Sequence, residues 1–429
     1  MEKKFILLSF MIDGLRSDYL QRIDLPFLRY ITQNGYCKII SEPLTYQTRP
    51  TYFAGLYPKE SNIANLFWLE QENSPFKFLK IFPLRILNKL CVKFRFLNFG
   101  IRYLIKKLAK CIEKWKGNTA SCLYLDTVNI PLYLLPFFGF SEKKNIFEKN
   151  AYKFKTLFDY LRNSNNDWTW IAYPTHLDLT VSAIKTTFNN HPKKDNSKFI
   201  FIHFAELDWI GHDFGPESDM IAQKLKKIDQ CINFIYDYYQ NKGIEVKITV
   251  FGDHGMVPVN ENINIIEYLS KRGIIFSKRD IYFIDSNMFR FWSKNEKKNQ
   301  QIEKFLKVAT FGELLTKDKQ KEYQYIFNHN KFGEILFLTN PGVVFFPNFF
   351  QFRDLPKGMH GYGPKCELNN TLLIIFEEKI KDKYSLSKEN HDLTDIFYVF
   401  LQLLQLEKNY IIKPEIKSKI LDFKNKDLF

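Results

Sequence analysis

The sequence predicts an α/β fold with a mostly parallel central sheet, helices on both faces of that sheet, and a basic cap inserted into the chain. Short apolar runs that end in a polar turn residue are typical of strands in a parallel sheet covered on both faces. Between these runs lie stretches with apolar residues every three or four positions, which indicate helices. The chain has 429 residues, 45% of them hydrophobic, so it can bury a large core. No apolar run approaches the ~18 residues that a membrane span requires.

The expected elements alternate along most of the chain. Strands are expected at residues 5–12, 36–40, 168–173, 199–207, 247–251 and 371–376, and helices at 151–162, 220–241 and 393–406. Residues 69–148 and about 275–350 break this alternation and are interpreted as insertions. We therefore expect one main domain made of residues 1–68 and 149–406, with a smaller insertion at about 275–350, a basic aromatic cap at 69–148 and a basic tail at 407–429.

The first residues and the cysteines bear on location. Met1-Glu-Lys-Lys before an apolar run is similar to a secretory signal, but no small-residue cleavage site follows, and Asp13-Gly14 comes directly after the run. We interpret the run as a buried strand. The six cysteines are scattered without a CxxC spacing, which is typical of reduced thiols rather than of a disulfide scaffold. These features favour a cytoplasmic protein, with attachment to the periphery of a membrane as a further option.

Three aspartates come at or near the ends of expected strands: Asp13, Asp208 and Asp253. The carboxyl ends of parallel strands share one edge of a sheet, where ligands bind, so the three carboxylates are expected to meet there. For any one aspartate taken alone, an ordinary turn residue is the favoured interpretation, and only the three together favour a ligand site. Histidines accompany two of them, because His212 follows Asp208 by four positions and His254 follows Asp253 directly.

A third histidine, His360, lies in a glycine-rich loop late in the chain. Carboxylate and neutral imidazole are ligands that suit Zn²⁺ or Mn²⁺. Six such side chains are too many for one tetrahedral ion and fit two ions, which is an arrangement used in phosphoester chemistry. The sequence therefore predicts two divalent metal ions, with Zn²⁺ preferred and Mn²⁺ as the alternative.

A hydroxyl side chain is expected to begin a helix after the strand at 36–40. Thr45 and Thr48 are both candidates, because a hydroxyl at a helix amino terminus lies where an anion is favoured. Either threonine is also compatible with a simple helix N-cap. Thr48-Arg49-Pro50 is a good helix start in its own right, which makes Thr48 a rival to Thr45.

Five motifs, taken together and in order, resemble the alkaline phosphatase superfamily, and most closely its type I phosphodiesterase/nucleotide pyrophosphatase branch. They are Ile-Asp13-Gly14, Thr45 ten residues before Gly55-Leu-Tyr-Pro58, Asp208-x-x-Gly-His212, Gly252-Asp253-His254-Gly255-Met256, and His360-Gly361. The resemblance implies that one metal is held by Asp13, Thr45, Asp253 and His254, and the other by Asp208, His212 and His360. It also implies that Thr45 is the nucleophile and that Thr48 and Arg49 contact the substrate.

The resemblance implies a metal-dependent hydrolase of phosphoesters, most closely a phosphodiesterase or nucleotide pyrophosphatase. The alternatives are a phosphomonoesterase or a phospho-group transferase of the same superfamily, or a membrane-surface binding protein whose hydrolase domain is inactive. The expected substrate is a small-molecule phosphoester or a lipid.

Positive charge is concentrated in residues 77–116. This segment holds twelve of the chain's Lys and Arg residues and one acid, Glu113, within a chain whose net charge is +15. Residues 98–115 are expected to form an amphipathic helix with a basic face, which is typical of helices on membrane surfaces. The segment is thus a candidate contact with an anionic membrane. The alternatives are a solvated cap over the active site and, as the least favoured, a nucleic-acid surface.

Overall fold

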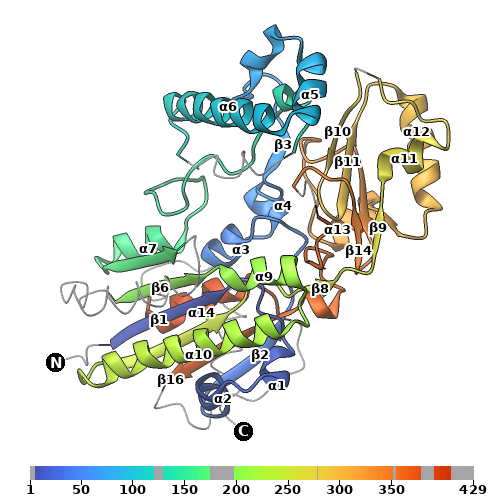
Figure 1. Cartoon of the computed structure of the whole chain (residues 1–429). Coiled ribbons are helices and arrows are strands. Elements are labelled where there is room, and N and C mark those ends of the chain that lie inside the picture. The colour runs from blue at the N-terminus through green and yellow to red at the C-terminus, as the bar shows by residue number, and fades with distance from the viewer. Residues whose placement is uncertain are drawn as a thin grey trace.

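The computed structural model describes residues 5–119, 129–173, 198–277, 279–350, 354–377 and 391–406. Figure 1 shows a large α/β body, which holds the main sheet, and a second body that carries α5, α6 and a smaller sheet. Among the described helices, none combines the length and the apolar character needed to cross a lipid bilayer. The predicted tail at 407–429 lies outside the described residues.

The main sheet has six strands in the order β2-β16-β7-β1-β6-β5. Its neighbours β7, β1, β6 and β5 pair in parallel, and β16 is antiparallel to both β7 and β2, so β16 alone runs against the others. The strands are β1 (Phe5–Ile12), β2 (Tyr36–Ile40), β5 (Trp168–Tyr173), β6 (Phe199–Phe204), β7 (Glu245–Phe251) and β16 (Thr371–Glu377). The predicted α/β class is confirmed. The expectation that 371–376 belongs to the parallel set is wrong.

Helices cover both faces of this sheet. Successive side chains of a strand point to opposite sides, so a strand made of apolar residues gives the sheet two apolar faces that both need covering. In β1, Leu8 and Phe10 pack in one hydrophobic cluster, whereas Leu7 and Met11 pack in another. The first cluster includes α2 (Pro26–Gln33) and α10 (Asp219–Gln240). The second includes α3 (Arg49–Ala54), α7 (Leu157–Asn163) and α14 (Asp395–Leu403).

The expected helices form, with shifted bounds. The expectation at 220–241 is confirmed by α10, and Gly243 follows its end with a φ of 68°. The helix expected at 151–162 begins only at Leu157, because Thr156 and Asp159 form a capping box that sets its start. The run at 199–207 is not all strand, since β6 ends at Phe204 and α9 (Glu206–Phe214) follows.

The two predicted insertions form one body. Its helices and strands are β3 (Phe67–Leu69), α5 (Leu84–Lys93), α6 (Arg95–Trp115), β4 (Phe138–Phe140), α11 (Ile265–Ser270), β10 (Ile281–Ile284), β11 (Met288–Trp292), α12 (Glu296–Lys307), β12 (Gly312–Leu314), α13 (Lys317–Glu322) and β13 (Ile335–Thr339). The short helix α4 (Pro58–Ser61) contacts α3 of the main body. Strands β10, β11, β13 and β12 make an antiparallel sheet. Ile105 of α6, Phe138 of β4 and Phe283 of β10 lie in one hydrophobic cluster.

The described parts of residues 69–148, which are 69–119 and 129–148, therefore have more regular structure than their sequence pattern indicates. The helix expected at 98–115 is confirmed by α6, which begins at Arg95. The remaining short elements are α1 (Tyr19–Arg22), β8 (Val257–Pro258), β9 (Glu261–Ile263), β14 (Val343–Phe345) and β15 (Gly358–Met359). The pairing of β15 with β8 holds the loop that follows β7 beside the loop that carries His360.

Candidate metal centre and active site

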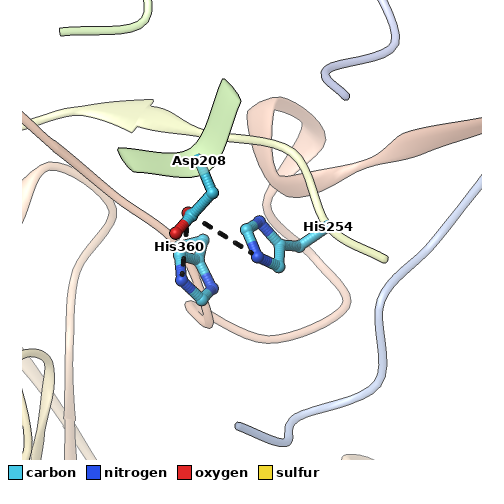
Figure 2. A group of neighbouring side chains, drawn as sticks. All are labelled: Asp208, His254 and His360. Carbon is cyan, nitrogen blue, oxygen red and sulfur yellow. Dashed lines mark ion pairs between the residues drawn. The ribbon is translucent and has the colours of Figure 1, made fainter. Parts of the chain in front are cut away.

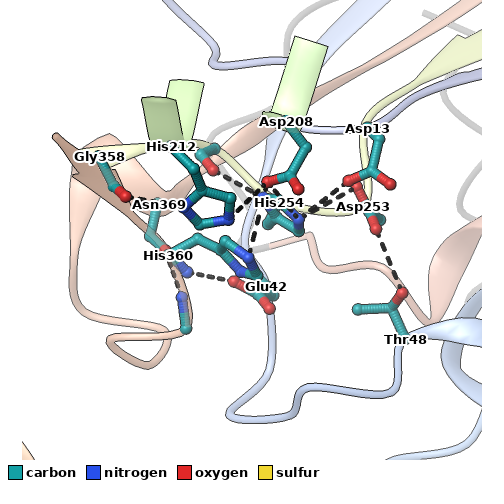
Figure 3. Close-up of polar contacts among 12 residues, drawn as sticks. Asp13, Glu42, Thr48, Asp208, His212, Asp253, His254, Gly358, His360 and Asn369 are labelled. Atoms are coloured by element: carbon teal, nitrogen blue, oxygen red, sulfur yellow. Dashed lines mark hydrogen bonds and ion pairs between the residues drawn. The ribbon is translucent and has the colours of Figure 1, made fainter. Parts of the chain in front are cut away.

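The predicted acidic and imidazole side chains meet at one edge of the main sheet (Figure 3). Asp13 directly follows β1, and Asp253 follows the end of the adjacent β7. Asp208 lies in the first turn of α9, just after β6, and His212 lies one helical turn later on the same helix. His360 follows β15. Because β7, β1 and β6 are parallel neighbours, their ends bring these residues together.

One group of possible metal ligands consists of Asp13, Asp253 and His254, whose ligand atoms all lie within 4.8 Å of one another. His254 Nε2 is 3.1 Å from Asp13 Oδ1 and 3.7 Å from Asp253 Oδ1. These three residues are the ones that the family resemblance assigns to the first metal, apart from the threonine.

The second group of possible ligands consists of Asp208, His254 and His360 (Figure 2), so it contains His254 where the prediction has His212. Asp208 Oδ1 lies 3.2 Å from His212 Nε2, 3.7 Å from His360 Nε2 and 3.8 Å from His254 Nε2. The rings of His254 and His360 stack with their centroids 3.5 Å apart. The three predicted ligands of the second metal are therefore together, and His254 stands between the two groups.

The imidazoles point their Nε2 atoms at the carboxylates. His212 Nδ1 is 2.8 Å from the carbonyl oxygen of Gly358, and His254 Nδ1 is 2.7 Å from that of Gly255. A carbonyl only accepts hydrogen bonds, so each Nδ1 carries the proton and a neutral ring has a lone pair on Nε2. A lone pair on Nε2 then faces a carboxylate oxygen, which is also an acceptor. The distance is 3.1 Å between His254 Nε2 and Asp13 Oδ1 and 3.2 Å between His212 Nε2 and Asp208 Oδ1. Such a contact needs a positive charge, either a second ring proton or a metal ion.

The electrostatics of the cluster agree with this interpretation. Burial lowers the pKa of His212 and of His254, but Asp208 and Asp253 respectively more than reverse this and leave both pKa values raised. Burial raises the pKa of Asp253 to about 7, and the charge of nearby Asp13 adds to the effect. Burial also lowers the pKa of His360 well below its usual value, and the neighbouring His254 lowers it further. Asp208 Oδ1, Asp253 Oδ1 and His360 Nδ1 are buried atoms without a hydrogen-bond partner among the described residues. Divalent cations would satisfy the unpaired carboxylate oxygens, so these side chains fit a metal centre.

The two candidate threonines have different surroundings. Thr45 is fully buried, and its hydroxyl donates to the carbonyl of Ala64 at 3.0 Å and accepts from Gln47 N at 3.0 Å. Thr48 is half-buried at the N-cap position of α3, and its Oγ1 lies 3.4 Å from Asp253 Oδ2. The structure therefore brings Thr48 to the ligand cluster. The Thr45 hydroxyl is instead bonded to Gln47 of its own loop and to Ala64 beyond α4, so these contacts do not support Thr45 as the metal-bound nucleophile, and that assignment stays a prediction.

A cavity of about 370 Å³ opens beside the cluster. Thr48 and Arg49 line it together with Asp13, Asp253, His203, His212 and His360, whereas Thr45 does not. Aromatic side chains of Tyr46, Tyr52 and Phe350 line it as well. Arg49 also lies 3.7 Å from the buried carboxylate of Glu142, which holds its guanidinium at the side of the cavity. The predicted substrate contacts Thr48 and Arg49 thus both face the space where a substrate would bind.

Sequence reasoning missed three residues around the cluster. His203 Nε2 lies 3.2 Å from Asp13 Oδ2, but His203 is inside β6 and is hidden in an apolar run. The buried Glu42 accepts a hydrogen bond from the side chain of Asn369, and burial raises the pKa of Glu42 to about 8. Asn369 Oδ1 in turn accepts from Gly361 N at 2.9 Å and so fixes the loop next to His360. The one feature of the sequence that could have indicated a role for His203 is its position near the end of the strand that precedes Asp208.

Comparison with known proteins gives a family match over most of the chain. Residues 7–363 match the family model described as type I phosphodiesterase / nucleotide pyrophosphatase. The rat ectonucleotide pyrophosphatase/phosphodiesterase family member 7 is 21% identical over 66% of this chain and 56% of its own length. Venom phosphodiesterase of Macrovipera lebetinus is 22% identical over 50% of this chain and 26% of its own length. The chain thus spans between about a quarter and just over half of these relatives.

Solved structures give the same fold. The murine ectonucleotide pyrophosphatase / phosphodiesterase 5, in an inactive Thr-to-Ala variant in complex with AMP, superimposes with a TM-score of 0.64 at 15% sequence identity. The match covers 94% of this chain and 95% of that one. A shorter match, 31% identical over 21% of this chain and 11% of its own length, is to the catalytic subunit of the human GPI ethanolamine phosphate transferase 2.

Proposed function

The chain belongs to the type I phosphodiesterase/nucleotide pyrophosphatase family, and on this basis we propose that it is a metal-dependent hydrolase of phosphodiesters with Thr48 as its nucleophile. The observation that carries the proposal is the position of the Thr48 hydroxyl, 3.4 Å from Asp253 Oδ2 and inside the cavity beside the ligand cluster. An N-cap position also puts this hydroxyl where a negatively charged phosphoryl group is favoured.

The proposed metal ligands follow from the two groups of side chains. Asp13, Asp253 and His254 would hold one divalent cation with Thr48, and Asp208, His212 and His360 would hold the other. This division is supported by the paired Nε2 and carboxylate atoms at 3.1–3.2 Å in each group. The mixture of imidazole and carboxylate favours Zn²⁺, with Mn²⁺ as the alternative. Bound cations would lower the pKa of a hydroxyl ligand and neutralise charge on the phosphoryl oxygens.

The protein groups have defined parts in the proposed reaction. Thr48 Oγ1 forms a bond to phosphorus while the bond from phosphorus to the departing oxygen breaks. The Thr48 proton passes to Asp253 Oδ2, and the departing oxygen takes a proton from solvent. Water then attacks phosphorus in the phosphothreonine, which regenerates the hydroxyl and releases a phosphomonoester. Arg49 lines the cavity beside Thr48 and would bind a phosphate oxygen during both steps.

The cavity supports a substrate with an aromatic or apolar group next to its phosphate. Tyr46, Tyr52 and Phe350 line the cavity and provide surfaces on which such a group would pack. A nucleotide is one substrate of this kind, and a related murine protein has been solved with AMP. A cytoplasmic location, expected from the sequence, stays a prediction.

Turnover of two chromogenic substrates tests the proposal. The purified protein, stripped of metal and reloaded with Zn²⁺ or Mn²⁺, is assayed with bis-p-nitrophenyl phosphate and with p-nitrophenyl phosphate. Metal-dependent turnover that is faster on the diester supports the proposal, whereas faster turnover of the monoester favours a phosphomonoesterase.

A phospho-group transferase is the second candidate, because the chain matches the human GPI ethanolamine phosphate transferase 2 over a short segment. Full metal loading with no release of p-nitrophenol from either substrate would contradict the hydrolase. Release that rises when an amine-free alcohol acceptor such as glycerol is added would favour the transferase, because an acceptor then competes with water for the phosphothreonine.

A further inference from the structure

Helices α5 and α6 expose an unusual amount of apolar surface. Of the 22 large apolar side chains that are exposed in the described structure, thirteen lie between Ile81 and Trp115. Scattered single apolar residues are normal on protein surfaces, but a concentration of this kind marks a contact site. The exposed side chains are Ile81, Phe82, Ile86, Leu90, Val92, Phe94, Phe96, Leu97, Phe99, Tyr103, Leu104, Leu108 and Trp115.

The faces of α6 show how this surface is organised. Ile105 and Ala109 are buried against the second body, and Arg102 is buried with them. Leu97, Leu104, Leu108 and Trp115 repeat at intervals of four and seven residues, so they form one stripe along a different face of the helix. In this stripe Leu104 is 60% exposed and Trp115 is 88% exposed. The helix therefore packs on its own body with one face and presents a second apolar face outward.

Positive charge borders this apolar stripe. Lys107, Lys110 and Lys114 follow one another at intervals of three and four residues and are all exposed. Lys110 and Lys114 have no carboxylate within ion-pair distance in the described part of the chain. The acid of this segment, Glu113, is buried and lies 3.9 Å from Lys116. The outward surface thus combines apolar side chains with unneutralised cations.

The surface is separate from the active site. Within the described residues, the side chains that line the 370 Å³ cavity include none from residues 77–116. Figure 1 shows α5 and α6 at the far end of the second body from the main sheet. Contacts with the cavity therefore give no support to the alternative in which residues 77–116 form a cap over the active site. The exposed apolar face of α6 has no partner among the described residues.

We propose that α5 and α6 form a docking surface for a lipid bilayer that contains anionic headgroups. An apolar stripe bordered by lysines matches the two layers at the surface of a bilayer. The apolar side chains would enter the region where headgroups meet acyl chains, and the ammonium groups would remain among the phosphates. A nucleic acid would pair with the lysines but would leave Leu104 and Leu108 without a partner. The charge and the apolar stripe together therefore favour a membrane.

Co-sedimentation with vesicles tests this surface. The full chain is mixed at low salt with vesicles of phosphatidylcholine alone or of phosphatidylcholine with phosphatidylglycerol. Retention is expected on the anionic vesicles only, and it should fall as salt is added, because the cations are screened. The double variant Leu104→Ser/Leu108→Ser and the triple variant Lys107→Gln/Lys110→Gln/Lys114→Gln should each lose retention by at least about tenfold.

A matched control comes from α12, where Lys297, Lys304 and Lys307 are also exposed. Changing these three to Gln removes the same charge and should leave vesicle binding within about twofold of the wild type. All variants should hydrolyse bis-p-nitrophenyl phosphate as the wild type does, which also reports that they are folded. The emission of Trp115, identified by subtraction of Trp115→Phe, should shift to the blue on anionic vesicles.

Three results would overturn the proposal. One is a wild-type chain that anionic vesicles do not retain at low salt. Another is the same loss of retention in the α12 control as in the α6 lysine variant. The third is full retention by Leu104→Ser/Leu108→Ser together with tight binding of a duplex oligonucleotide, which would assign the surface to nucleic acid.

Discussion

Replacing Thr48 and Thr45 separately by alanine should have different effects: one variant should lose activity and the other should lose stability. Thr48→Ala removes the hydroxyl that faces Asp253 in the cavity, so turnover of a diester should be lost. Thr45→Ala removes a buried hydroxyl that is bonded to Ala64 and Gln47, so the protein should be less stable but should keep its rate per folded molecule.

The magnitudes follow from these contacts. Thr45→Ala loses two buried hydrogen bonds at 3.0 Å, which should cost about 1–3 kcal/mol in the free energy of unfolding. Thr48 is half-buried and makes one long contact of 3.4 Å, so Thr48→Ala should change that free energy by no more than about 0.5 kcal/mol. Loss of the attacking group should lower kcat by at least about 10³-fold, which is ~4 kcal/mol in the activation barrier.

The assay pairs initial rates on bis-p-nitrophenyl phosphate with thermal unfolding and metal content for each variant. Thr48→Ser, which keeps a hydroxyl, serves as the control and should recover part of the rate. Both alanine variants should retain metal. The reasoning is refuted if Thr45→Ala is inactive at unchanged stability while Thr48→Ala turns over at the wild-type rate.

Further predictions concern the metal centre and two ion pairs. Asp208→Asn should remove about one metal ion per chain, measured by elemental analysis, and two ions retained would contradict the assigned ligands. A chelator should lower the melting temperature, Zn²⁺ or Mn²⁺ should restore it, and an unchanged melting temperature would argue against a bound metal. Asp285→Ala should destabilise the chain by about 3–5 kcal/mol in denaturant unfolding, because Arg290 is then buried without its partner; a loss below about 1 kcal/mol would contradict this. Burial raises the pKa of Asp18, but the hydrogen bond and charge of Arg16 outweigh burial and leave the pKa of Asp18 lowered. The Asp18–Arg16 pair therefore stabilises the folded chain above the pKa that Asp18 has in the unfolded chain, and this stabilisation is lost as the pH falls through the lowered pKa. The stability difference between wild type and Arg16→Leu should therefore shrink between about pH 7 and about pH 3, and a constant difference would contradict the pairing.

The sequence was sufficient to predict which carboxylates and imidazoles gather at one edge of the sheet, because these residues lie at the ends of elements. Asp13 and Asp253 follow buried apolar runs, and parallel strands bring such positions to one edge. His212 could be assigned with Asp208 because four residues make one helical turn. Each of these inferences depends on local pattern and on one general property of α/β sheets.

The choice of threonine could not be made in the same way. Counting back ten residues from Gly55 selects Thr45, but α3 begins at Arg49, so Thr48 is the residue at the N-cap. The local pattern Thr48-Arg49-Pro50 does predict this helix start, but the spacing to Gly55 favours Thr45, and sequence alone does not decide between the two signals. His203 was missed for a related reason, since a histidine inside an apolar strand resembles a core residue until its neighbour Asp13 is known.

The reversed direction of β16 places a long stretch of chain beside the proposed active site. Strand β7 leaves the sheet at the same edge at which β16 enters it, so the stretch between Phe251 and Thr371 begins and ends beside the candidate metal ligands. Phe350 and Ser286, from within this stretch, line the cavity. Insertions or deletions there would remodel the pocket wall while the strand ends, and hence the reaction chemistry, stay as they are.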